Sequence, residues 1–122
     1  MILADTSIWI DHLRVGDAEL KLRLNTNQIM VHPFIVGEIA LGILRQRDLI
    51  LAALRDLPKV KIANEEEVLH FIDAEALFSL GIGYVDAHLL AATRLTPGTR
   101  LWSRDKRLAA ADALLQLNVD FP

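Results

Sequence analysis

The sequence begins with MILADTS at residues 1–7, and this stretch decides how the fold is interpreted. Its first four residues are apolar and predict a short buried strand, while the polar residues after them predict a turn and the start of a helix. Thr6 or Ser7 can cap that helix, whose first apolar side chain is Ile8. Asp5 thus directly follows the first strand, which is where ligands bind in a parallel α/β sheet.

Strands and helices alternate through the rest of the chain. We expect further strands at residues 28–32, 60–62, 100–103 and 118–119. Helices are expected over 18–24, from Pro33 onward, and over 47–57, 65–80, 84–95 and 104–115. The alternation predicts a single domain, residues 1–122, of the α/β class: a three-layer α/β/α sandwich with a mainly parallel central sheet.

Two of these helices carry clear local signals. Asn64 precedes three glutamates, which is typical of an N-cap followed by an acidic first turn. The helix that begins at Pro33 has apolar residues at helical spacing, which predicts a buried stripe made of Val36, Ile39, Ala40, Ile43 and Leu44.

Composition excludes several classes of protein. The 122 residues include 16 acidic and 13 basic side chains, a formal charge of −3, and no cysteine. Disulfides and thiolate metal sites are therefore excluded, so a metal could bind only to oxygen or imidazole. The mildly acidic balance argues against a protein that coats nucleic acid through bulk charge. Collagen-like and disordered chains are also excluded, because 52% of the residues are hydrophobic.

No membrane-spanning helix is expected despite a mean hydropathy of +0.31. The longest stretch without Asp, Glu, Lys or Arg is residues 24–37, which contains four polar amide or hydroxyl side chains and a histidine, whereas a spanning helix needs about 20 mostly apolar residues. Asp5 comes too early for a signal peptide. We expect a soluble, cytoplasmic domain, and its surplus of apolar residues predicts self-association or a partner.

Four acidic residues stand where chemistry is expected. Asp5 and Asp105 follow the first strand and the strand that ends at Ser103, while Glu38 is the only charged residue between Leu24 and Leu44. Asp86 shares a helical face with two leucines. Taken singly, Asp86 and Asp105 are more simply explained as first-turn acids that answer the helix dipole.

If the four carboxylates converge, they repel one another by several kcal/mol, at about 4 kcal/mol for each pair 4 Å apart. Such a cluster takes up protons or a hard cation, and Mg²⁺ or Mn²⁺ suits a site made only of acids. These ions activate water and hold phosphate oxygens, so the predicted chemistry is hydrolysis of a phosphodiester. Thr6, Ser7 and Ser103 are candidates for holding a ligand carboxylate or a water.

Basic residues gather around the fourth acid. A solvated helix face explains them equally well, but their place beside a proposed ligand makes them candidates for contacting the phosphates of RNA. The candidates are Arg94, Arg100, Arg104, Lys106 and Arg107. Other chemistries lack their motifs, because the four histidines have no zinc-helix spacing and no phosphate-binding glycine loop is present. His88 is expected to be a packing or surface residue.

The sequence resembles the PIN-domain nucleases, and within them the VapC-type toxins of bacterial toxin–antitoxin pairs. The resemblance covers nearly the whole chain and rests on four segments in order: ILADTS at 2–7, VGEIALG at 36–42, DAHLLAA at 86–92 and LWSRD at 101–105. It implies an α/β/α domain whose acids bind Mg²⁺ or Mn²⁺ and cut RNA. The matching positions are Asp5, Glu38, Asp86 and Asp105.

The resemblance also implies a homodimer and a cognate antitoxin whose C-terminal segment blocks the active site. Ser7 and Ser103 match the family's small polar positions. The sequence departs from the family at the last motif, where Ser103 stands in place of a common threonine and Leu108 in place of a frequent aromatic residue. The fourth acidic position is also the loosest in the family, so the role of Asp105 is the least secure of the four.

Two other functions are compatible with this length and alternation. A receiver-like phospho-accepting signalling domain needs an acidic pair after the first strand and an aspartate after the third, whereas the sequence has Thr6-Ser7 and residues 62–64, Ile-Ala-Asn, at those places. A non-catalytic PIN-like interaction module would have a degenerate site, and the complete set of four acids argues against it.

Overall fold

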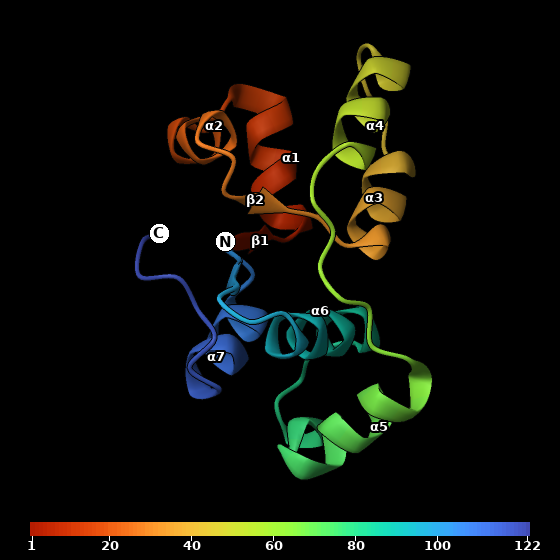
Figure 1. The fold of residues 1–122 in the computed structure, drawn as a ribbon, viewed down its shortest axis with the longest axis vertical. Coiled ribbons are helices and arrows are strands. Elements are labelled where there is room, and N and C mark those ends of the chain that lie inside the picture. Colours follow the sequence, from red (N-terminus) through yellow and green to blue (C-terminus); the bar gives the residue numbers. More distant parts are fainter.

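Three short parallel strands form the centre of the computed structural model, which describes residues 1–122 (Figure 1). The order is β2–β1–β3, with β1 (Ile2–Ala4) between β2 (Ile29–Met30) and β3 (Arg100–Trp102). In the register, Ile2 is paired with Ile29 on one side and Arg100 on the other. The carboxyl ends of β1 and β3 therefore lie side by side.

Single bridges extend the sheet at both edges. Val31 pairs with Lys59, and Leu101 pairs with Asn118. The strand predicted at 60–62 is therefore wrong, and the one predicted at 118–119 is reduced to the single bridge of Asn118, flanked by a backbone hydrogen bond from Val119 to Leu101 (3.2 Å). Beyond Lys59 the chain leaves the sheet edge, because the backbone N–H of Lys61 donates to the hydroxyl of Thr96 (2.9 Å) rather than to a neighbouring strand.

Helices cover both faces of the sheet, which confirms the predicted three-layer α/β/α architecture (Figure 1). On one side lie α1 (Thr6–Val15), α2 (Ala18–Asn25), α3 (Pro33–Ala40) and α4 (Arg47–Arg55). On the other side lie α5 (Glu65–Ala74), the 3₁₀ turn η1 (Leu77–Ser79), α6 (Tyr84–Leu95) and α7 (Lys106–Leu114).

The helix that begins at Pro33 is shorter than its apolar pattern predicts. It ends at Ala40, and its buried side chains are Ile35 and Ile39. Ile43 is fully exposed at 106%, so the predicted stripe is wrong at Ile43, whereas Leu44, which lies beyond the helix, is partly buried against the core. The chain turns at Gly42, which leaves Ile43 in the connection to α4.

Two other helix boundaries differ from the prediction. Asn64 is an N-cap with a complete capping box, as predicted, but α5 ends at Ala74 rather than near Leu80. Ala76 takes a left-handed conformation with φ of 52°, which ends the helix and starts η1. The last helix begins at Lys106 rather than Arg104, because Asp105 is its N-cap.

The core contains residues of all three strands and of helices on both faces of the sheet, and α6 is its most deeply buried helix. Every residue of α6 from Ala87 to Thr93 is buried, and the largest fully buried side chain is Trp102 of β3. Burial of α6 on nearly all sides fixes the position of its N-terminal turn, which carries Asp86. No helix has both the length and the apolar character that a membrane span requires.

Candidate active site

Asp5 occupies the end of β1 and caps α1. Its side chain is buried, at 5% exposure, and its Oδ1 accepts from the backbone N–H of Ser7 (3.0 Å) and from the Ser7 hydroxyl. Its Oδ2 accepts from the hydroxyl of Ser103 (2.6 Å). The prediction that Thr6 or Ser7 caps this helix is wrong, because the Asp5 carboxylate reaches the free N–H group first.

These hydrogen bonds and the burial of Asp5 have opposite effects on the pKa of its carboxyl. Burial raises the pKa of the carboxyl above its ordinary value, and the hydroxyls of Ser103 and Ser7 lower it in part. The two carboxylate oxygens are fixed by donors from two segments, the first turn of α1 and the loop after β3. Asp5 is thus an oriented carboxylate without a cationic partner.

Glu38 faces Asp5 from α3. Its side chain is exposed, and its Oε1 accepts from the hydroxyl of Thr6 (2.6 Å), the residue that follows Asp5. This hydrogen bond joins α3 to the N-terminal turn of α1. The structure therefore brings two of the predicted acids to the same edge of the sheet.

Asp86 lies in the first turn of α6. The backbone N–H of Gly83 donates to its Oδ2 (3.1 Å). Burial raises the pKa of Asp86 most, the hydrogen bond from Gly83 lowers it, and the charges of Asp105, Asp5 and Glu38 raise it further. The charges of the other three predicted acids thus act on Asp86, so all four carboxylates lie close enough to interact electrostatically.

Asp105 completes the group at the start of α7. Its Oδ1 accepts from the backbone N–H groups of Arg107 (3.1 Å) and Leu108 (3.0 Å). Its own backbone N–H donates to the hydroxyl oxygen of Ser103 (3.0 Å), and that hydroxyl donates to Asp5. The loop after β3 is in this way tied to the end of β1.

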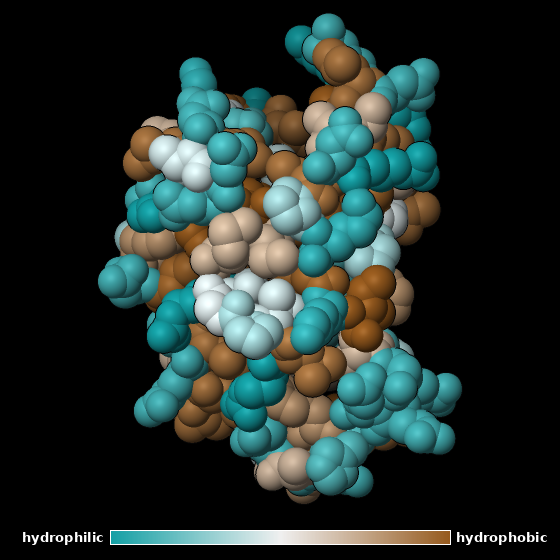
Figure 2. All heavy atoms as spheres, in the orientation of Figure 1, coloured by the Kyte–Doolittle hydropathy of each residue, from teal (hydrophilic) through white to brown (hydrophobic).

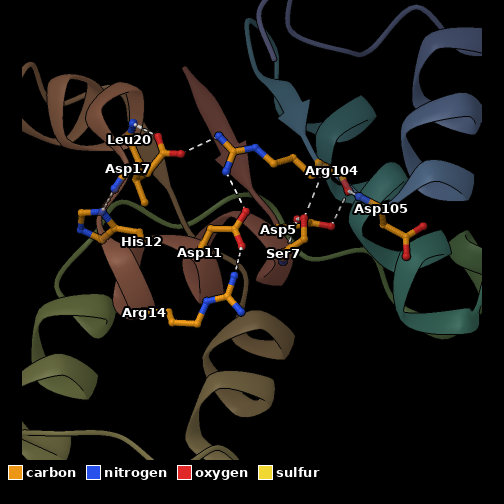
Figure 3. A network of polar contacts seen from close by, with 10 residues as sticks. Asp5, Ser7, Asp11, His12, Arg14, Asp17, Leu20, Arg104 and Asp105 are labelled. Atoms are coloured by element: carbon orange, nitrogen blue, oxygen red, sulfur yellow. Dashed lines mark hydrogen bonds and ion pairs between the residues drawn. The ribbon is translucent and has the colours of Figure 1, made fainter.

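Ser7 makes a second connection between the end of β1 and the loop after β3 (Figure 3). Its hydroxyl donates to Asp5 and accepts from the backbone N–H of Arg104 (3.0 Å). Ser7 and Ser103 therefore position Asp5 and the loop that carries Asp105. Both hydroxyls donate to the Asp5 carboxylate.

No lysine or arginine forms an ion pair with any of the four acids. The five ion pairs of the protein lie elsewhere, and two of them join Arg104 to Asp11 and Asp17 (Figure 3). The guanidinium of Arg104, although adjacent in sequence to Asp105, is thus turned toward α1 and the start of α2. The negative charge at the carboxyl edge of the sheet is left uncompensated within the protein.

The donor set fits a hard divalent cation. As the side chains stand, no three acidic or histidine side chains surround one point where an ion could sit. The reason is visible in the contacts, since Glu38, Asp86 and Asp105 each turn to a local hydroxyl or backbone N–H. Four carboxylates without a cationic partner are nevertheless the ligands that Mg²⁺ and Mn²⁺ prefer.

The five basic candidates divide into two groups. Four have partners within the protein: Arg94 with Glu75, Arg100 with two backbone carbonyls of the C-terminal segment, Arg104 with its two aspartates, and Arg107 with the carbonyl of Gly81. Lys106 has no such partner. Lys106 and Arg107 are exposed in the first turn of α7, the helix that Asp105 caps.

Sequence reasoning missed a group of rings beside the carboxylates. His88 is buried, as a packing residue, and lies between Phe34 (centroids 4.8 Å apart) and Tyr84 (4.6 Å). His32 is fully buried behind them, and burial, with the charge of His88, lowers its pKa to about 4. The i, i+4 spacing of Tyr84 and His88 was the available signal.

A buried acid in α7 was also missed. Asp112 is 1% exposed, and its Oδ1 has no hydrogen-bond partner. The signal was present in the sequence, since Asp112 stands alone in the apolar run AAADALL, residues 109–115. The reasoning that singled out Glu38 applies equally to it.

The fold and the site define a class of protein: a parallel α/β/α domain with uncompensated carboxylates at the carboxyl edge of its sheet. Residues 2–114 match the model of the PIN domain family. The chain therefore belongs to the PIN domain family, which confirms the resemblance seen in its four segments. The receiver-like alternative is left without support.

The chain is also similar to two named proteins. The chain is 45% identical over 113 residues to Ribonuclease VapC32 of Mycobacterium tuberculosis, in strains CDC 1551 / Oshkosh and ATCC 25618 / H37Rv. The match covers 93% of this chain and 91% of each relative. The similarity therefore extends over most of the domain.

Proposed function

We propose that this protein is a Mg²⁺- or Mn²⁺-dependent endoribonuclease and the toxin of a toxin–antitoxin pair. The observation that carries the proposal is the group of four acids, Asp5, Glu38, Asp86 and Asp105, without a basic partner. Membership of the PIN domain family and the similarity to proteins named ribonucleases support RNA as the substrate.

Each residue has a distinct role in this proposal. Asp5, Glu38 and Asp86 would be the principal ligands of the cation, and Asp105 would complete the site directly or through water. Such an ion supplies Lewis-acid activation of the scissile phosphate and of the attacking water. Ser7 and Ser103 hold the Asp5 carboxylate in one orientation, and Thr6 does the same for Glu38. Lys106 and Arg107 would contact phosphates of the RNA.

The proposed partners are RNA, a second copy of the chain and an antitoxin. Large apolar side chains are exposed around the connection between α3 and α4, among them Leu41 (89%) and Ile43 (106%). Exposed apolar residues of this size support a covering partner. A mass near 13.6 kDa by light scattering would contradict a homodimer.

The catalytic proposal is tested by incubating RNA with purified protein and Mg²⁺ or Mn²⁺. We expect endonucleolytic cuts whose downstream fragments carry a 5′-phosphate, because water attacks phosphorus in line and displaces the 3′ oxygen. Asp5→Asn keeps the shape of the side chain but removes its charge, so cleavage should fall to background. Activity that survives in Asp5→Asn or in excess EDTA would contradict the mechanism.

A non-catalytic interaction module would leave the RNA uncut in the same assay. Calorimetry with Mn²⁺ separates the two, because a degenerate site binds no cation. Asp73→Asn, which removes an exposed carboxylate of α5 that is not one of the four acids, is a matched control and should leave both binding and cleavage unchanged.

A further inference from the structure

An apolar pocket lies at the start of α6, the helix whose first turn carries Asp86. It has a volume of about 210 Å³ and is formed by the end of α5, by η1 and by the first turn of α6. Six of its seven lining residues are hydrophobic, and two of them are the aromatic residues Phe78 and Tyr84. Nothing in the proposed cleavage mechanism uses this pocket.

Gly83 connects the pocket to the site. Its backbone N–H donates to Oδ2 of Asp86 (3.1 Å), and the same residue lines the pocket. The pocket and the Asp86 carboxylate therefore share one residue, which puts the pocket within reach of a nucleotide whose phosphate is held at the carboxylates.

Tyr84 presents an aromatic ring that is both exposed and fixed in place. The side chain is 49% exposed, and its ring packs edge-on against buried His88, with centroids 4.6 Å apart and planes at 86°. Phe78, on η1, is 74% exposed. Large aromatic rings left half in water beside an active site are typical of surfaces that stack against bases.

A positive charge borders the same loop. Arg107 approaches the loop before α6, where its Nη1 donates to the carbonyl oxygen of Gly81 (3.4 Å). Carboxylates, a guanidinium and an aromatic apolar pocket thus meet within a few residues of one another. These are the groups that recognise the three parts of a nucleotide: a cation-bound phosphate, a second phosphate and a base.

We propose that the pocket takes an unpaired nucleobase of the substrate RNA, adjacent to the scissile phosphate, and that Tyr84 is the stacking residue that determines specificity there. The proposal rests on the proposed endoribonuclease function. The bound base must be flipped out or single-stranded, because a paired base cannot enter a pocket in the protein.

The test uses a short single-stranded RNA that wild-type protein cuts at one position with Mn²⁺. A series of oligonucleotides replaces one base at a time near the cut by an abasic ribose. We expect the wild-type KM to rise between about fivefold and 150-fold for one abasic position only, which corresponds to base–aromatic stacking of about 1–3 kcal/mol.

Variants assign this effect to the ring. Tyr84→Leu should raise KM for the intact RNA by a similar factor and show no further loss with the abasic oligonucleotide. Tyr84→Phe keeps the ring and should behave as wild type. Leu114→Ala, at an exposed apolar position at the end of α7, is the control and should change neither value.

Each outcome of this test either supports or contradicts base binding in the pocket. If wild type cuts RNA and Tyr84→Leu still discriminates the abasic position, the pocket does not bind a base and the proposal is wrong. If Tyr84→Leu instead changes the mass by light scattering and leaves discrimination intact, the pocket is an interface between copies, which also overturns it. Fluorescence anisotropy of labelled RNA separates the two proposals: binding that depends on Tyr84 without cleavage contradicts only the catalytic function, and absence of both contradicts both.

Discussion

Asp112 makes the stability of this protein depend on pH in a way that one substitution can reveal. Burial raises the pKa of its carboxyl to about 7, the charge of Arg100 lowers it, and the charge of Asp5 raises it. In the unfolded chain the same group titrates near 3.8. Between these two pH values the folded protein holds a proton that the unfolded chain has released.

The sign and size of the effect follow from this difference. The free energy of unfolding rises by about 1.36 kcal/mol for each pH unit lowered below about 7, and it is lost again as pH rises toward 7. His32 acts in the opposite direction, because its pKa of about 4 lies below the ordinary 6.5, so stability falls as pH falls between those values. The two slopes nearly cancel in wild type below pH 6.5.

Asp112→Asn removes one slope and leaves the other. We expect the free energy of unfolding of the variant, relative to wild type, to fall by about 2.7 kcal/mol between pH 8 and pH 5, since two pH units lie below about 7. Urea denaturation at fixed protein concentration measures this difference at each pH. The unpaired amide of the variant shifts both values equally, so the change with pH is the informative quantity.

Parallel stability curves for Asp112→Asn and wild type would refute the reasoning, because they would mean that Asp112 titrates alike in the folded and unfolded states. Asp73→Asn, at an exposed position, is the control for removing a carboxylate from the surface. Its curve should run parallel to that of wild type over the same range.

Three further predictions concern single side chains. Ser103→Ala removes a donor that orients Asp5, so the Mn²⁺ affinity measured by calorimetry should fall by about 10–100-fold; an unchanged affinity would mean that Ser7 positions Asp5 alone. Arg104→Ala breaks two partly exposed ion pairs and should lower the free energy of unfolding by about 1 kcal/mol, less at 1 M salt; equal losses at both salt concentrations would point to packing instead. Asn64→Ala removes the capping box of α5 and should cost about 1 kcal/mol in urea denaturation without changing RNA cleavage, whereas reduced cleavage would place α5 in the site.

The sequence predicted those features that depend on local pattern. A strand ending in an acid, at residues 2–5, located one edge of the site, and the capping signal at Asn64 located the start of a helix. Both are decided within a few residues, because burial of an apolar run and capping of a helix start depend on neighbours along the chain. The order of the four acidic segments then identified the family.

The errors arose where tertiary contacts override local pattern. Ile43 has the right spacing to continue the apolar stripe of α3, but the chain turns at Gly42 and no other element covers Ile43. The segment after Lys59 has strand-like residues, yet Thr96 takes the N–H of Lys61. Spacing cannot show which backbone groups a distant side chain will satisfy.

Side-chain orientation at the site was beyond sequence reasoning for a related reason. The sequence placed four carboxylates at one edge, and the structure shows each of them bound to a local hydroxyl or N–H group. Like charges a few ångströms apart favour such separate partners, since each donor stabilises one charge without bringing two together. Because the donors are hydroxyls and backbone N–H groups rather than arginines, none of them cancels a charge. A divalent cation is therefore the partner that could draw the carboxylates together, and the serines that hold Asp5 would keep one ligand in place while the others turned.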